Sequence, residues 1–168
     1  MANNSKESIL KTPPQSLEAE EAVLGSMLTS KDAVSRALEI IIADHFYKEA
    51  HRRIFQAMHD LFNQGEPVDA VSVINELKKR KQLDISGGAY FVTGLADSVP
   101  TSANIDHYAR IVLEKASLRE LIDAAAELSS DAFNDQHGLE DILDRAEQRI
   151  FSISQGRLKG KFQQLSPV

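Results

Sequence analysis

The last third of the sequence predicts two helices joined by a short turn, and this hairpin constrains the fold more than any other feature. From Asn104 to Phe133 the chain contains no proline or glycine, so we expect one uninterrupted helix. After the polar turn 134–138, a second helix is expected from about Leu139 to Ile153. The first helix would be roughly 45 Å long at ~1.5 Å per residue. A globule of the preceding ~85 residues would measure only about 30 Å across, so we expect the hairpin to project beyond its own domain.

Apolar residues follow helical spacing on both arms of this hairpin. On the first helix the intervals alternate between three and four, which is typical of coiled-coil geometry, at Leu118, Leu121, Ala125, Leu128 and Ala132. On the second helix the matching positions are Leu139, Ile142, Leu143, Ala146, Ile150, Phe151 and Ile153. One stripe from each helix closes the hairpin on itself. Other apolar residues (Ile122, Phe133 and Phe151) remain, and each would gain on the order of 1.5–3 kcal/mol from burial.

We therefore predict that the hairpin packs against a second copy of itself. The predicted interface consists of Tyr108, Ile111, Leu118, Leu121, Ile122, Ala125, Leu128, Ile142, Ala146 and Ile150. The alternative is that the long helix lies across the preceding domain and that all of this surface joins one monomeric core.

The rest of the chain predicts an all-α protein, because its apolar residues keep helical periods throughout. Ser16 and Asp69 are expected to cap helices, and Gly25 inside the first helix predicts a close helix–helix contact there. Further helices are expected at about 32–42, 48–64, 70–81 and 89–95, the third of these ending in the basic run 78–81. The predicted organisation is a disordered N-terminal arm (1–15), a helical globular head (16–100), the helical hairpin (101–153) and the start of a linker (154–168). The apolar residues of that last segment have no folded face to anchor them, so we expect the chain to be a fragment of a longer protein.

Composition narrows the class of protein. The chain has no cysteine, which excludes disulfides and thiolate metal sites and is consistent with a cytoplasmic location. It has no apolar run of membrane-spanning length and no secretory signal at Met1–Leu10, so no membrane partner is expected. The net charge of −6 argues against duplex DNA binding by the whole surface. Proteins are the expected partners.

No active site can be assembled from the sequence. The histidines do not form an H-E-x-x-H motif, and no serine lies in a G-x-S-x-G elbow. Gly160–Lys161 resembles a phosphate-binding loop, but Gly156 lies one residue too close and Phe162 replaces the required hydroxyl. We therefore predict no catalytic, cofactor-binding or metal-binding residue in this chain.

Each of two basic segments can be interpreted either as a binding site or as surface and packing residues. The run Lys78–Lys81 could contact nucleic acid, or it could be a solvated last helical turn, where cations are favoured. His51 and Arg52–Arg53 are interpreted as surface or packing residues rather than a site. A free-standing helical nucleic-acid-binding or scaffold protein therefore stays open as the alternative function.

Four stretches of the chain carry markers in a specific order and spacing. The first is Pro13–Pro14 followed by residues 19–28. The second comprises Phe46–Tyr47, His51, Ile54–Phe55, Leu61, Gly65, Pro67–Val68–Asp69 and Leu77. The third comprises Gly87–Gly88, Tyr90, Leu95, Pro100, Asn104, Tyr108, Arg119 and Leu121–Ile122, and the fourth Ala146–Glu147, Ile150–Phe151 and Ile153. In this order the markers resemble the N-terminal domain and linker start of the bacterial replicative DNA helicases, the DnaB family.

The resemblance implies an all-helical head with an extended hairpin. It implies that hairpins pair between neighbouring subunits, as a dimer or as a trimer of dimers in a hexamer, to form a collar where primase docks and which influences loading by a helicase loader. Family members hydrolyse ATP with Mg²⁺ in a RecA-like C-terminal domain that moves along single-stranded DNA. No residue of that domain can be assigned here. The chain alone is therefore expected to be an assembly and docking domain without catalysis.

Overall fold

The computed structural model is all-helical in the residues that it describes, which are 11–99, 101, 104–134 and 136–162. In chain order the elements are α2 (Leu17–Thr29), α3 (Lys31–Ile40), η2 (Ala43–His45), α4 (Glu49–Asn63), α5 (Ala70–Lys79), η3 (Asp84–Ser86), α6 (Gly88–Asp97), α7 (Ile105–Asn134) and α8 (Leu139–Phe162). The predicted all-α class is confirmed, and no strand occurs in these residues. No helix among them is both long and apolar enough to cross a membrane.

Side-chain caps explain where three helices begin. The hydroxyl of Ser16 accepts a hydrogen bond from the Ala19 N–H at 3.2 Å, and the Asp69 carboxylate accepts one from the Ser72 N–H at 2.8 Å. These two caps were predicted from the sequence. Ser30 caps α3 in the same way, so α2 and α3 are separated by a single residue. Each cap satisfies an amide that the first helical turn leaves unpaired.

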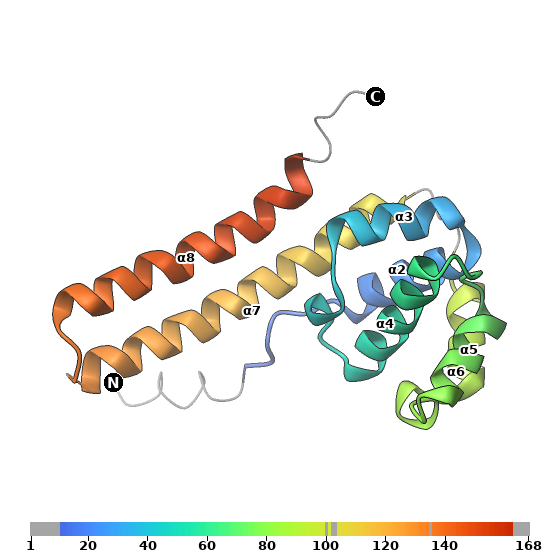
Figure 1. The fold of residues 1–168 in the computed structure, drawn as a ribbon, viewed down its shortest axis with the longest axis horizontal. Coiled ribbons are helices and arrows are strands. Elements are labelled where there is room, and N and C mark those ends of the chain that lie inside the picture. The colour runs from blue at the N-terminus through green and yellow to red at the C-terminus, as the bar shows by residue number, and fades with distance from the viewer. Residues whose placement is uncertain (1–10, 100, 102–103, 135, 163–168) are drawn as a thin grey trace.

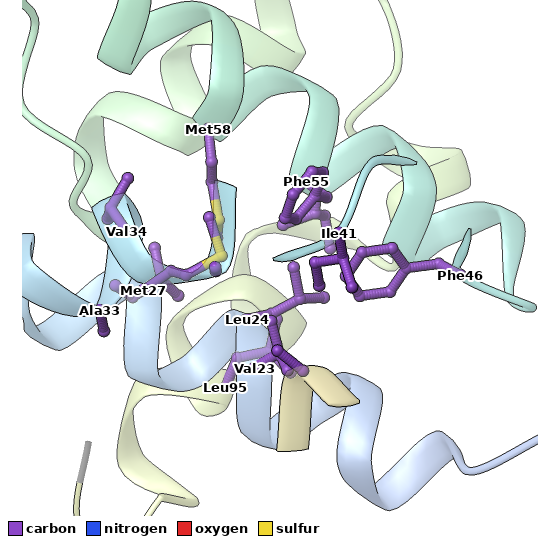
Figure 2. Packing of buried hydrophobic residues seen from close by; sticks show 14 of the residues in the cluster. Val23, Leu24, Met27, Ala33, Val34, Ile41, Phe46, Phe55, Met58 and Leu95 are labelled. Atoms are coloured by element: carbon purple, nitrogen blue, oxygen red, sulfur yellow. The ribbon is translucent and has the colours of Figure 1, made fainter. Parts of the chain in front are cut away.

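The core of the head is centred on α2, which contacts α3, α4, α6 and α7. Val23, Leu24 and Met27 of α2 are fully buried in it. Figure 2 shows them beside Phe46 and Phe55, whose ring centroids are 4.9 Å apart. The core therefore includes Phe46, from the segment between α3 and α4, as well as residues of the helices.

The long helix α7 belongs to the head along its first half and leaves it along its second half. Its first four turns are buried through Ile105, Ala109, Val112, Leu113 and Ala116. Arg36 of α3 adds a two-bond ion pair to Asp106 at 2.8 and 2.5 Å, and this bonding lowers the pKa of the Asp106 carboxyl. Beyond the head, α7 (orange in Figure 1) projects, and α8 returns antiparallel beside it. The predicted projecting hairpin is confirmed.

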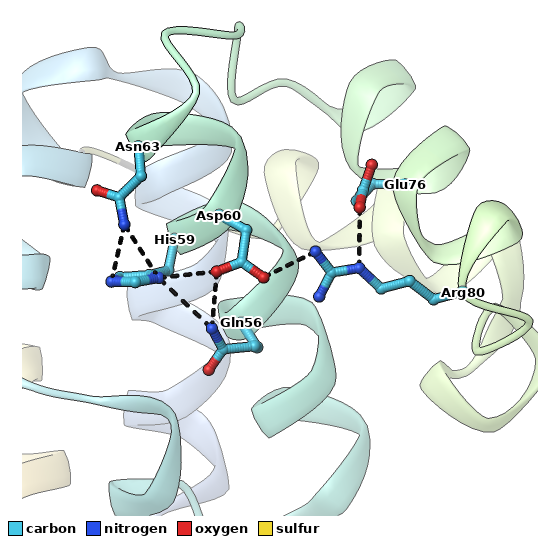
Figure 3. A network of polar contacts seen from close by, with 6 residues as sticks. All are labelled: Gln56, His59, Asp60, Asn63, Glu76 and Arg80. Atoms are coloured by element: carbon cyan, nitrogen blue, oxygen red, sulfur yellow. Dashed lines mark hydrogen bonds and ion pairs between the residues drawn. The ribbon is translucent and has the colours of Figure 1, made fainter.

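A polar network joins α4 to α5 and accounts for one residue of the basic run. Arg80 donates to Glu76 at 2.9 Å and to Asp60 at 2.7 Å (Figure 3). Burial raises the pKa of the Asp60 carboxyl, but hydrogen bonds from His59, Arg80 and Gln56 lower it more, so its pKa lies below its usual range. Arg80 therefore has a structural role, while the neighbouring lysines are exposed.

Two segments differ from the sequence-based expectation. The second hairpin helix continues to Phe162, so its expected end at Ile153 was wrong, and residues 154–162 are helical where a linker start was predicted. The glycine at 156 has no close neighbour, and a glycine inside a helix costs only about 1 kcal/mol relative to alanine. The helix α8 can therefore continue through this position. Of the predicted disordered arm, residues 1–10 lie outside the described part. Residues 11–15 are not helical, and 11–14 line a groove together with residues of α7.

At Gly25, α2 lies close to the backbone of α6. A Cβ atom there would overlap the Leu95 carbonyl oxygen of α6 and Cγ2 of Val99. The close contact predicted at this glycine is therefore confirmed. The Leu95 carbonyl oxygen is a backbone atom, so it cannot move aside as a flexible side chain would.

We expect Gly25→Ala to destabilise the fold by about 1–3 kcal/mol, because overpacking exceeds the gain in helix propensity. Gly94→Ala in α6 is the matched control, since a Cβ at Gly94 meets no atom within 4 Å. That change should stabilise the fold by up to ~1 kcal/mol. Urea denaturation of both variants measures the two effects, and equal stability of the two variants would contradict the close contact.

Candidate oligomerisation interface

The two arms of the hairpin close on each other along a narrow seam. Ala124 of α7 is fully buried, and Leu128 is half-buried. Opposite them on α8, Ile142, Ala146 and Ile153 are half-buried. Ion pairs of 3.3 Å, Arg145 with Asp131 and Arg149 with Glu127, connect the two helices. The intramolecular contact thus uses one stripe on each helix.

Large apolar residues remain exposed beside this seam. They include Leu118 (39% exposed), Leu121 (44%), Ile122 (54%), Leu139 (72%), Leu143 (52%) and Ile150 (44%). None of them can be covered by the other arm of the same hairpin, because the seam already occupies the facing sides. Together with the exposed Ala125 they are called the apolar hairpin face below.

Helical geometry puts these residues on one side of the hairpin. Each helical position lies about 100° around the axis from the one before it. Ala125 follows the seam residue Ala124, and Leu143 follows the seam residue Ile142. Because α7 and α8 run antiparallel, a step toward the C-terminus on either helix turns toward the same side. The exposed residues of both arms therefore form a single surface two helices wide.

The opposite side of the hairpin is polar. A groove of about 570 Å³ runs there between the helices, lined by Glu127, Leu128, Ser130, Asp131, Arg145, Gln148, Arg149 and Ser152. The hairpin is therefore amphipathic across its thickness, with a charged side that suits water and an apolar side that does not.

The structure distributes the ten predicted interface residues over three places. Five lie on the apolar hairpin face: Leu118, Leu121, Ile122, Ala125 and Ile150. Leu128, Ile142 and Ala146 lie in the seam, half-buried by the other arm. Tyr108 and Ile111 pack against the head core, so they do not belong to the free surface. Sequence reasoning left Leu139 and Leu143 out of the interface, although Leu143 directly follows the seam residue Ile142 and Leu139 lies three positions before it.

A buried polar pair lies at the root of the hairpin. His51 of α4 is fully buried, and its Nδ1 lies 2.6 Å from a carboxylate oxygen of Glu20, which is 2% exposed. The other Glu20 oxygen accepts the Tyr47 N–H at 2.6 Å. The His51 ring stacks on Phe91 with an interplanar angle of 4°. This agrees with a packing role for His51, but the partner in α2 lies 31 positions away and no local spacing indicates it.

The described residues contain no group of three or more metal-ligating side chains. The distinctive feature of the described residues is the exposed apolar face of the projecting hairpin. Comparison with known proteins identifies the family. The model of the DnaB-like helicase N terminal domain matches residues 12–114. The chain belongs to this family.

Relatives in the DnaB family cover nearly all of this chain. The replicative DNA helicase DnaB of Geobacillus stearothermophilus is 42% identical over 156 residues, which are 93% of this chain and 34% of the relative. The replicative DNA helicase DnaC of Bacillus subtilis gives the same values. The chain thus spans about a third of the length of these curated relatives.

Solved DnaB structures have the same fold. The crystal structure of the N-terminal domain of the DnaB helicase from Mycobacterium tuberculosis is similar with a TM-score of 0.79 and 41% identity, covering 84% of this chain and 99% of that one. A DnaB-like replicative helicase, whose structure describes its interactions with primase, is similar with a TM-score of 0.69 and 25% identity. That match covers 84% of this chain and 31% of the other.

His45, at the root of the hairpin, generates a prediction about pH. Burial lowers its pKa below the usual 6.5, and Arg119 adds to this effect while Asp44 opposes it. Its Nδ1 accepts the Ile42 N–H at 3.1 Å, which requires an unprotonated nitrogen. Because the folded pKa lies below the unfolded one, the unfolded chain takes up the proton first. Stability is therefore fully present above about pH 6.5 and declines as the pH falls from there toward the folded pKa.

We expect His45→Asn to reduce this acid sensitivity, because the Asn side-chain oxygen can accept the same N–H without titrating. The parent should lose more stability than the variant below pH 6.5, with a difference in slope of at most about 1.4 kcal/mol per pH unit. Urea denaturation at several pH values measures both slopes. Identical slopes in parent and variant would contradict this role of His45.

Proposed function

We propose that this DnaB-family domain is the assembly and docking domain of a hexameric replicative DNA helicase, and that its hairpins pair between subunits. The observation that carries the proposal is the apolar hairpin face, which is wide, continuous and backed by a polar side. In this proposal the paired hairpins form the collar of the ring, as dimers that associate into a trimer of dimers.

The shape and chemistry of the face favour a second hairpin as the occupant. Two amphipathic hairpins that join their apolar sides form a four-helix bundle, a common way to bury such surfaces. A twofold pair uses the same patch on both copies, so a single exposed face is sufficient. In the single chain the leucines and isoleucines of the apolar hairpin face are about half exposed. Burial between two hairpins would therefore give each residue part of the ~1.5–3 kcal/mol available from full burial.

The family supports the remaining parts of the proposal. Primase is the expected partner on the collar, since the similar DnaB-like helicase was solved with attention to its interactions with primase. A helicase loader is a further expected partner. In this proposal, ATP hydrolysis with Mg²⁺ and the main contacts to single-stranded DNA belong to the part of the helicase that this chain does not match, since the chain spans 34% of the Geobacillus relative. We propose no catalytic step for the residues of this chain and a cytoplasmic site of action.

Light scattering across micromolar concentrations tests the pairing. We expect the parent to associate and Ile122→Asp or Leu143→Asp to weaken association at least tenfold, since about 1.4 kcal/mol corresponds to tenfold in Kd. Both residues are more than half exposed in the single chain, so the fold should survive the change. Leu118→Asp, on the same face, should act alike.

Ser130→Asp and Gln148→Asp are the matched controls, because they add the same charge on the polar side of the hairpin. Both should leave association unchanged. A strictly monomeric parent, or equal effects of the substitutions on the two sides, would contradict hairpin pairing. Salt-dependent binding of a labelled single-stranded oligonucleotide that is lost when Lys78, Lys79 and Lys81 are neutralised would instead support a nucleic-acid-binding protein.

A further inference from the structure

The N-terminal segment 11–15, called the strap, lies against α7 near the point where the helix leaves the head. Ala116 is the last α7 residue that is buried in the head, and Arg119 follows one turn later. There Arg119 donates a hydrogen bond from Nη1 to the Pro14 carbonyl oxygen at 2.6 Å. Lys11 to Pro14 line a groove of about 670 Å³ with Ala116, Arg119 and Glu120 of α7. The strap therefore runs along the root of the hairpin and is bonded to it.

The same guanidinium reaches a third segment of the chain. Its Nη2 donates to the His45 carbonyl oxygen at 2.8 Å, and its central carbon lies 5.5 Å from the centroid of the Tyr47 ring. Arg119 therefore connects the strap, the η2 turn and α7 through one planar group. The geometry suits arginine in particular, because its fixed fork reaches two carbonyls at once while its face lies over a ring.

The segment that carries these partners is itself fixed to the head. Glu20 of α2 accepts the Tyr47 N–H, and Arg52 donates to the Phe46 carbonyl oxygen at 2.6 Å. Phe46 is fully buried in the core. The partners of Arg119 on the η2 side cannot move without disturbing the core, so the bond holds α7 to a rigid point.

Arg119 lies near the root of the hairpin, so a small tilt of α7 at this residue moves the distant tip of the hairpin. Asn134 lies 15 positions beyond it on the same helix, a lever of about 22 Å at ~1.5 Å per residue. A tilt of about 10° at the root would move the tip by roughly 4 Å, which is enough to separate side chains that must interdigitate.

We propose that the strap and Arg119 form a clasp that sets the direction in which the hairpin leaves the head. In this view the N-terminal segment is a positioning device for the hairpin, and Arg119 is its positioning residue. The clasp acts within one chain. Its consequence for assembly, a defined angle at which two hairpins meet, rests on the pairing proposed above.

The distance between head and hairpin tests the clasp directly. The chain has no cysteine, so Asn75→Cys in α5 and Ser130→Cys in α7, both exposed, accept spin labels at these two sites alone. Pulsed electron–electron distance measurement with an excess of unlabelled protein reports the intramolecular distance. We expect one narrow distribution in the parent and a doubled width, or a mean shifted by about 4 Å or more, in Arg119→Gln.

Arg110→Gln is the matched control, because it removes the same charge from an exposed position of the same helix. It should leave the distribution unchanged. Deletion of residues 1–14 removes all of the strap except Gln15, including the Pro14 carbonyl that Arg119 binds, and keeps the Ser16 cap. It should therefore reproduce the effect of Arg119→Gln, and it replaces that variant if the variant does not fold. An unchanged distribution in the folded Arg119 variant or in the folded deletion variant would overturn the clasp.

Light scattering on the same variants separates this inference from hairpin pairing. If the distance distribution broadens while association is weakened, both proposals are supported. If the distribution broadens in the variants but the parent itself is monomeric, the clasp stands and the pairing fails. If association is normal and the distribution stays narrow, the clasp is wrong and the pairing stands.

Discussion

The whole structure depends on the packing of the first half of α7 against the head. Ile105, Ala109 and Val112 are buried between α2 and α3, so one end of a 30-residue helix is held firmly by the core. Because the helix is continuous, that grip also positions its free half and, through the seam, α8. The head thus provides the anchor and the hairpin provides the surface. Without burial of the α7 root, a hairpin with so much exposed apolar surface would have no fixed orientation to offer a partner.

Because α7 is anchored in the head, the hairpin presents one apolar side and one polar side in a fixed orientation. The apolar residues around Ala124 and Ile142 pack against each other in the seam. The exposed apolar residues beside the seam are therefore the ones left for binding. The polar groove on the other side, with its ion pairs, keeps that side soluble. The proposed pairing needs such a division, because a hairpin that binds a neighbour on one side must not aggregate on the other.

The helical architecture could be predicted because its signals are local. Ser16 and Asp69 cap helices by hydrogen bonds within three residues, and the absence of proline and glycine from 104–133 indicates one long helix. Gly25 indicated a close contact because a glycine inside a helix has a cost that packing must offset. The end of α8 was misjudged, because the glycine at 156 is tolerated at a helical position where a Cβ would meet no atom within 4 Å.

The candidate site was only partly predictable, because it depends on contacts between distant segments. Spacing alone cannot tell Leu128 in the seam from Ile122 on the free face, nor show that Tyr108 is already used by the head. The Glu20–His51 pair and the bonds of Arg119 to Pro14 and His45 likewise connect residues far apart in the chain. Such pairs follow from the fold and leave no periodic signal.

The central claim is that the apolar hairpin face meets the same face of another copy. A single-cysteine scan tests it most directly, because the chain has no cysteine of its own. Cysteines placed one at a time along Leu118, Ile122, Leu143 and Ile150, and along Glu127, Ser130, Gln148 and Ser152, sample the two sides. Under mild oxidation the account predicts disulfide-linked dimers at positions on the apolar side and few on the polar side. Equal linkage on both sides, or linkage confined to the polar side, would contradict it.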